Sequence, residues 1–262
     1  MGGISQTAVA RSTSREAQQM RRRHAVQRAL VAAIAPLWIP LAIVYFRFVR
    51  GYRIRDLARV RADYARLRAE SRRPLLVCAN HLTLIDSFIV GWALRSPWGY
   101  LRDFDSFPWN TPERTNFAGT RLHSVLVYLA KCIPITRGGR REDTGAVLDR
   151  VAYLLERGEV ALLFPEGGRS RTGRVEVDAG GAWGVGRVVG ATADCRVLCV
   201  YLRGDAQATW SAFPAKGDVF SIALACIEPK SDERGARRSR DLAGQIVAKL
   251  AAMEREYLDD RQ

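Results

Sequence analysis

Short apolar runs alternate with segments of helical apolar spacing from residue 74 onward. The runs predict strands, and apolar residues recurring every three or four positions predict helices. Strands are expected over residues 75–79, 132–136, 159–164, 196–202 and 218–227. Helices are expected over residues 84–94, 121–131, 143–157, 179–190 and from about 240 onward. An irregular, aromatic-rich stretch is expected over residues 96–120. This alternation predicts an α/β fold whose mixed, largely parallel sheet is layered by helices.

The N-terminal part has a different pattern. Residues 1–20 are polar without an apolar period and predict a disordered tail. An uncharged run follows over residues 29–46, with arginines on both sides. As a straight helix it would reach roughly 27 Å, slightly short of a bilayer core of about 30 Å. Pro36 and Pro40 also interrupt it, and proline bends a helix.

Three structures compete for this run: a single spanning helix, a bent pair of short helices dipping into one leaflet, and a helix buried against the rest of the protein. The bent pair is favoured, because arginines on both flanks place both ends on the cytoplasmic side. Three regions are therefore expected: a polar tail over 1–20, a membrane-binding helical segment over 21–60 and the main domain over 61–262.

The charge balance narrows the choice of partners. The chain carries 41 Lys+Arg against 27 Asp+Glu, a net charge of +14. This excess favours anionic partners such as membrane lipids, an acidic carrier protein or a phosphorylated substrate. Nucleic acid is not expected, because the basic residues are spread along the chain instead of gathering in one recognition helix.

Candidate chemistry begins where the first apolar run ends. Asn80 and His81 follow residues 75–79, and Asp86 comes five residues after the histidine. A neutral imidazole accepts a proton at cellular pH, and a neighbouring carboxylate fixes its tautomer. The pair therefore predicts a general base. Thr83 and Asp86 also have the spacing of a capping box, so Asp86 could instead only cap the next helix.

A glycine-rich loop provides the second group of candidates. Residues 164–173 read Phe-Pro-Glu-Gly-Gly-Arg-Ser-Arg-Thr-Gly directly after a predicted strand. Exposed backbone N–H groups beside arginines suit an anion such as a phosphate, although a solvated basic turn has the same composition. Arg137, after the strand expected over 132–136, would add a cation at the same sheet edge.

Together these segments resemble the glycerolipid acyltransferase family over about residues 74–229. Asn80-His81 through Asp86 is similar to that family's NHxxxxD motif, with Thr83 where serine is frequent. Residues 164–170 are similar to FPEGTRS, and Arg137 falls where the second motif keeps its arginine. The basic, apolar N-terminal segment resembles the family's membrane-binding element.

The resemblance implies a membrane-associated O-acyltransferase on the cytoplasmic face of the cytoplasmic membrane. Acyl-CoA or acyl carrier protein would be the donor, and a lysophospholipid, above all 1-acyl-sn-glycerol-3-phosphate, the acceptor. His81 would be the base and Asp86 its partner, with no metal or redox cofactor. Substrate-binding roles would fall to Asn80, Thr83, Arg137, Glu166, Gly167 and Arg169.

Three departures leave the acceptor open. Gly168 stands where the family usually has threonine, and Cys199 occupies a place where proline is common. The aromatic stretch over 98–117 matches no pattern of the family. The alternatives are the same reaction on an ornithine lipid, a glycolipid or a pigment, and a non-catalytic basic membrane-binding module.

Overall fold

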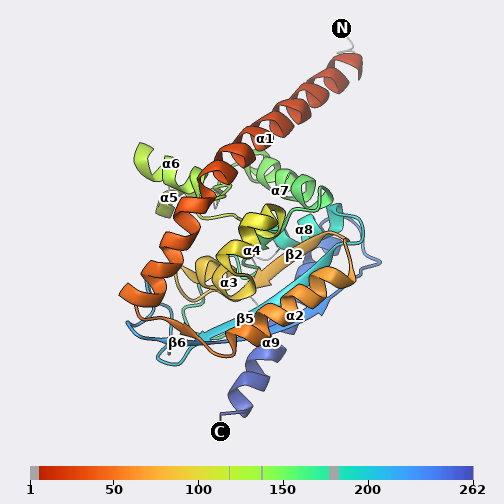
Figure 1. Ribbon diagram of the computed structural model, residues 1–262. Helices are drawn as coiled ribbons and strands as arrows, with labels where there is room; N and C mark the ends of the chain where they lie inside the picture. The colour runs from red at the N-terminus through yellow and green to blue at the C-terminus, as the bar shows by residue number, and fades with distance from the viewer. Residues whose placement is uncertain (1–5, 118, 137, 177–182, 262) are drawn as a thin grey trace.

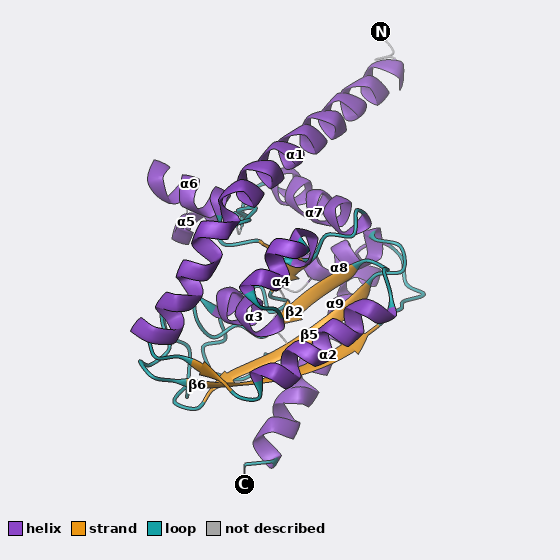
Figure 2. Ribbon diagram, in the orientation of Figure 1, coloured by secondary structure: helices purple, strands orange, loops and turns teal. Residues whose placement is uncertain are grey.

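A six-stranded sheet lies between layers of helices in the computed structural model, which describes residues 6–117, 119–136, 138–176 and 183–261 (Figures 1 and 2). The strand order is β1-β6-β5-β2-β4-β3. All neighbouring strands are parallel except β5 and β6, which pair antiparallel. The strands are β1 (Arg53–Ile54), β2 (Leu75–Ala79), β3 (Trp109–Asn110), β4 (Ala161–Leu163), β5 (Arg196–Gly204) and β6 (Val219–Ile227). The predicted α/β class with a mixed, mostly parallel sheet is confirmed.

The helices lie on both faces of this sheet. They are α1 (Gln6–Val44), α2 (Leu57–Glu70), α3 (Asp86–Leu94), α4 (Pro97–Arg102), α5 (Arg114–Phe117), α6 (Arg121–Leu129), α7 (Arg141–Glu156), α8 (Trp183–Ala191) and α9 (Gly235–Asp259), with a π-helix over Tyr45–Val49 and a 3₁₀ turn over Phe104–Ser106.

Strand β2 shows why both faces are covered. All five of its residues are buried, and successive side chains point to opposite faces. Leu75 and Val77 pack with residues of α2 and α3, whereas Leu76 and Cys78 pack with residues of α7, α8 and α9. The strand therefore runs through the centre of the core, and its carboxyl end opens directly onto the loop that carries His81.

Helix α1 differs from the expected bent pair of short helices. It is continuous through Pro36 and Pro40, because each proline removes only one backbone hydrogen bond and one face of the helix is held by packing. Val31, Ala35 and Ile39 on that face are buried against the domain. Residues 6–20, expected as a disordered tail, continue the same helix, since alanine, arginine and glutamine readily extend a helix that is already formed.

Polar contacts also attach α1 to the sheet. His24 Nε2 lies 2.7 Å from Glu159 Oε1, and Trp109 Nε1 donates to Glu159 Oε2 at 2.7 Å. The Gln27 amide donates to the carbonyls of Tyr128 and Cys132 at 2.8 and 2.9 Å. His24, Gln27 and Glu159 are almost fully buried. The N-terminal helix is thus an integrated part of the fold.

The opposite face of α1 carries exposed apolar side chains: Val26, Leu30, Leu37, Leu41 and Val44, followed by Tyr45, Phe48 and Val49 of the π-helix. Within the described residues, the segment Arg15–Val49 is the one helical stretch long and apolar enough to cross a membrane, by length and composition. Because its other face packs on the domain, it combines a protein-facing and a solvent-exposed apolar side.

Three further predictions differ from the structure. Residues 132–136 form isolated bridges instead of a strand, since Pro134 has no N–H to donate. The stretch over 96–120, expected to be irregular, supplies β3 at the sheet edge and three short helical segments. The boundary expected between residues 60 and 61 falls inside α2, and β1 already pairs with β6.

Candidate active site

His81 lies at the carboxyl edge of the parallel strands, in the loop between β2 and α3. Its backbone is held from both sides by the glycine-rich loop that follows β4. The N–H of His81 donates to Glu166 Oε1 at 3.0 Å, and the N–H of Ser170 donates to the His81 carbonyl at 2.9 Å. The two motifs found in the sequence therefore meet in one site, although they are far apart along the chain.

The imidazole of His81 pairs with Asp86, as the spacing predicts. His81 Nδ1 lies 3.0 Å from Asp86 Oδ2. A carboxylate only accepts hydrogen bonds, so in the neutral ring Nδ1 carries the proton and Nε2 is left as the basic nitrogen. The His81 side chain is 12% exposed, against 2% for Asp86. The ring can therefore be reached from the cleft, while its partner is shielded from water.

Several further donors hold the Asp86 carboxylate in place. Oδ2 also accepts the backbone N–H groups of Leu82 and Thr83 at 2.6 and 2.7 Å, and the Thr83 hydroxyl donates to Oδ1. The predicted capping box is only half formed: Asp86 receives the Thr83 N–H, but the Thr83 hydroxyl binds Asp86 and α3 begins at Asp86 itself. Asp86 consequently both shapes the helix start and orients His81.

Phe164 supports the other side of the imidazole. The two rings are stacked, with centroids 3.9 Å apart and planes inclined by 15°. Together with the bond to Asp86, this contact restricts both the position and the rotation of the His81 ring. The glycine-rich motif contains Phe164, but nothing in its sequence context predicts this stacking, because the contact joins two segments that are far apart along the chain.

Glu166 is a buried carboxyl group with an altered pKa. Oε1 accepts the His81 N–H, whereas the buried Oε2 makes no hydrogen bond of ordinary geometry within the described residues. Burial raises the pKa of Glu166 to about 8, against the lowering effect of the backbone N–H groups of His81 and Glu176. A pKa in this range favours the protonated form at neutral pH, in which Glu166 supports His81 without adding a negative charge to the site.

Asn80, Thr83 and Gly167 lie beside His81 and are tied to the protein itself. The Asn80 amide exchanges two hydrogen bonds with the backbone of Leu202, at 3.0 and 2.7 Å. Thr83 is fully buried next to Asp86. Gly167 has φ +66°, a conformation that favours glycine, and its N–H donates to the Phe164 carbonyl at 3.1 Å. In this structure all three shape the loops, and their substrate-binding roles stay predictions.

His81 opens into a cleft of about 470 Å³, here called the His81 cleft. Its walls combine cationic, aromatic and apolar side chains, among them Phe88, Asn110, Leu126, Phe164, Arg169, Arg171 and Trp210. The Arg169 guanidinium lies over the Trp210 ring, 4.9 Å from its centroid. The structure thus brings Arg169 to the site together with Arg171. Arg137 lies outside the described residues.

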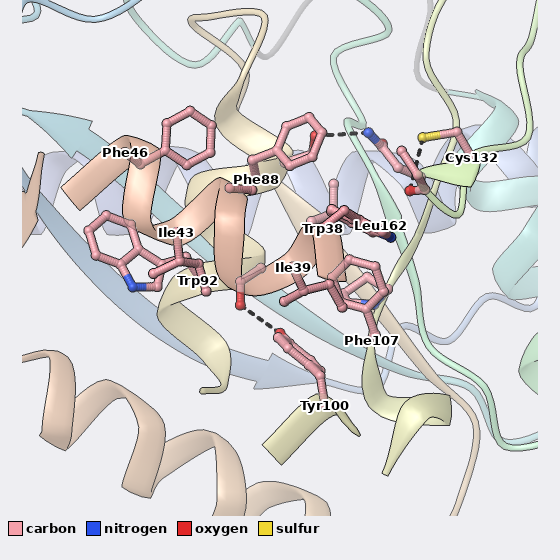
Figure 3. Close-up of a pocket in the computed structure, with 16 residues that line it drawn as sticks. Trp38, Ile39, Ile43, Phe46, Phe88, Trp92, Tyr100, Phe107, Cys132 and Leu162 are labelled. Carbon is pink, nitrogen blue, oxygen red and sulfur yellow. Dashed lines mark hydrogen bonds between the residues drawn. The ribbon is translucent and has the colours of Figure 1, made fainter. Parts of the chain in front are cut away.

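A tighter apolar pocket adjoins the His81 cleft and shares with it the residues Ser87, Phe88, Asn110, Ala130 and Cys132. Figure 3 shows how its walls come together from distant parts of the chain. Trp38, Ile39, Ile43 and Phe46 belong to α1 and its π-helical end, Trp92 to α3, Tyr100 to α4, and Phe107 to the following loop. The aromatic stretch that the sequence left unassigned thus lines a pocket next to His81.

Comparison with known proteins gives one match. A protein-family model described as Acyltransferase matches residues 53–226. These residues include β1 to β5, most of β6, and both loops that meet at His81. A search of curated proteins found no match.

Proposed function

The chain belongs to the acyltransferase family, and on that premise we propose that it transfers a fatty acyl group from acyl-CoA or acyl carrier protein to the hydroxyl of a lysophospholipid. The favoured acceptor is 1-acyl-sn-glycerol-3-phosphate, which would give phosphatidic acid. The observation that carries the proposal is the His81–Asp86 pair at the wall of a cleft that has arginines on one side and an apolar pocket on the other.

The proposed chemistry is direct transfer. His81 Nε2 removes the proton of the acceptor hydroxyl as its oxygen attacks the thioester carbonyl carbon. The tetrahedral intermediate collapses, the carbon–sulfur bond breaks, and the imidazolium returns the proton to the leaving thiolate. Asp86 stabilises the imidazolium, and Phe164 and Glu166 keep the ring in place for both proton transfers. General-base catalysis of this kind contributes typically about 10²–10⁴-fold.

The remaining walls suit the two substrates. Arg169 and Arg171 line the His81 cleft, and guanidinium groups bind phosphate with charge-assisted hydrogen bonds. We place the acceptor's phosphate there. The apolar pocket, with a volume of about 40 Å³ in this structure, would take the terminal part of the thioester's hydrocarbon chain, because it adjoins the cleft and its lining is almost entirely apolar or aromatic.

Helix α1 supports a membrane location for the reaction. Its outer face exposes a row of apolar side chains, whereas its inner face packs on the domain from His24 to Phe46. A helix crossing a bilayer alone would have lipid on every side, so the two-faced pattern favours a helix lying in one leaflet. No acidic residue occurs over residues 17–55, which suits the anionic cytoplasmic leaflet.

The test is an acceptor panel. Purified protein receives a radiolabelled long-chain thioester together with lysophosphatidic acid, a lysophospholipid whose phosphate carries a neutralising choline, an ornithine lipid or a glycolipid. We expect the fastest transfer to lysophosphatidic acid, because its phosphate monoester has the highest charge. Faster transfer to another acceptor would show that lysophosphatidic acid is not the preferred acceptor, while acyl transfer itself would stand. If no acceptor receives the acyl group, both the acceptor and the proposed acyl-transfer activity are wrong.

A further inference from the structure

Helix α6 exposes apolar side chains on the outside of the molecule. Leu122, Val125 and Leu126 are 67%, 53% and 55% exposed, and no residue of the helix is buried. Leucine and valine side chains left in water lose the stabilisation that burial provides. Three such residues on one nine-residue helix indicate a surface that is covered by something else.

This surface adjoins the exposed face of α1. Gln27 of α1 donates to the carbonyl of Tyr128 in α6 at 2.8 Å, so the two helices are in direct contact. Val26 and Leu30, which flank Gln27 on α1, are themselves about half exposed. The apolar row of α1 therefore begins beside α6, and both helices lie on the same side of the molecule (Figure 1).

The charge of the sequence around α5 and α6 indicates the kind of partner. Between Glu113 and Glu142 the sequence contains no acidic residue, while Arg114 and Arg121 are exposed at the ends of α5 and α6. Residues 17–55, which include the exposed face of α1, are free of acids in the same way. Exposed apolar residues flanked by cations are typical of surfaces that bind anionic lipids.

Helix α6 also reaches the site. Leu126, exposed on the outside, and Val127 both line the His81 cleft. We propose that α6 is a second lipid-contacting element, separate from α1, whose apolar face enters an anionic bilayer and forms the rim over which a lysolipid passes into the His81 cleft. The passage of an acceptor rests on the proposed function, whereas the membrane contact of α6 can be measured without any reaction.

The experiment places an environment-sensitive fluorophore on α6. Cys226 is the exposed cysteine, and Cys78, Cys132, Cys195 and Cys199 are buried. A Cys226→Ser background therefore allows selective labelling of Leu122→Cys with a nitrobenzoxadiazole dye. The matched control is Asp232→Cys, exposed in the loop between β6 and α9. That loop lies near the amino-terminal edge of the sheet, where Glu228 pairs with Arg73 before β2.

Vesicles of phosphatidylglycerol and phosphatidylcholine are added to each labelled protein. We expect the label at residue 122 to show a blue shift and at least about a twofold rise in emission, and the label at residue 232 to remain unchanged. A Leu122→Ser, Val125→Ser double variant should partition onto the same vesicles about tenfold more weakly than wild type, because two apolar side chains no longer enter lipid.

The outcomes separate this proposal from the proposed function. If the protein sediments with vesicles but the label at residue 122 stays in water, the role of α6 is wrong and acyl transfer is untouched. Absence of any vesicle binding would overturn the α6 contact as well. A blue shift in a protein that transfers no acyl group would support α6 and reject the enzymatic proposal.

Discussion

The backbone N–H of His81 donates to Oε1 of Glu166 at 3.0 Å, which joins the loop after β2 to the loop after β4. The acid of the glycine-rich motif therefore contacts the backbone of the histidine directly. Burial raises its pKa to about 8, which favours a bond between a backbone amide and a neutral carboxyl group at pH 7. We infer that Glu166 is a positioning residue for His81.

This relationship predicts that Glu166→Gln retains most of the activity, because a glutamine carbonyl accepts the same N–H and a neutral amide resembles the protonated acid. Glu166→Ala should lower kcat about tenfold or more, since small displacements of a catalytic group are costly. Steady-state kinetics of both variants at pH 7 provide the measurement. Equal losses in the two variants would mean that Glu166 acts through its charge and not through this bond.

The same carboxyl group predicts a pH effect on stability. A glutamate ionises near pH 4.5 when unfolded, but Glu166 holds its proton to about pH 8 when folded. The folded state binds the extra proton over this window, so the contribution of Glu166 to stability falls as pH rises from about 4.5 to about 8. In urea unfolding experiments, the free energy of unfolding of Glu166→Gln should rise relative to that of wild type between about pH 5 and about pH 9, roughly the ends of that window.

The apolar pocket predicts a change of chain-length preference. Gly91 lines this pocket, and a Cβ added there would meet only a Phe107 ring carbon at 3.9 Å, an ordinary contact. Gly91→Ala should fold normally and slow the longest accepted thioesters about tenfold, with shorter ones unchanged. Competition between thioesters of graded chain length measures this.

The matched control is Gly184→Ala. Gly184 lines a different cavity behind Glu166, and an added Cβ there would meet Leu148 methyl groups at 3.8 Å. We expect this variant to keep the wild-type preference. The reverse result would be a changed chain-length preference in Gly184→Ala and an unchanged one in Gly91→Ala. It would indicate that the acyl chain binds in that second cavity.

Helix α1 should depend on the buried pair of His24 and Glu159. Although burial opposes ionisation, the bonds from His24 and Trp109 leave the pKa of Glu159 below its ordinary value of 4.5. The stabilisation that the ionised Glu159 carboxylate provides is therefore complete above about pH 4.5. It is lost as the pH falls through the lowered pKa. Glu159→Gln should cost about 3 kcal/mol of unfolding free energy at pH 7.

Urea denaturation tests this with Asp143→Asn as a control, because Asp143 pairs with Arg140 on the exposed surface. The surface variant should unfold close to wild type. A Glu159→Gln protein as stable as the control would show that the His24–Glu159 pair is not needed to hold α1 on the domain.

The sequence predicts the parts of the site that depend on local order. A polar residue after an apolar run predicts a strand-end side chain, and the interval from His81 to Asp86 predicts their pairing across a helix start. Contacts between distant segments leave no such signal. Nothing near Phe164 indicates that its ring lies on His81, and nothing near Asn80 indicates that its amide binds Leu202.

The same limit explains the N-terminal helix. Hydropathy and proline positions treat α1 as an isolated helix, and an isolated helix would be expected to bend or end at Pro36 and Pro40. The buried bond of His24 to Glu159 and the packing of Ala35 and Ile39 decide the outcome. Both depend on residues far from α1 in the sequence.

We propose that His81 is the general base of an acyl transfer. The direct test is single-turnover transfer from a radiolabelled thioester to lysophosphatidic acid by wild type, His81→Ala and Asp143→Asn, a control on the exposed surface of α7. We expect His81→Ala to be slower by about 10²–10⁴-fold with an unchanged circular dichroism spectrum, and Asp143→Asn to match wild type. A folded His81→Ala protein that transfers the acyl group at a near-normal rate would show that His81 is not the base.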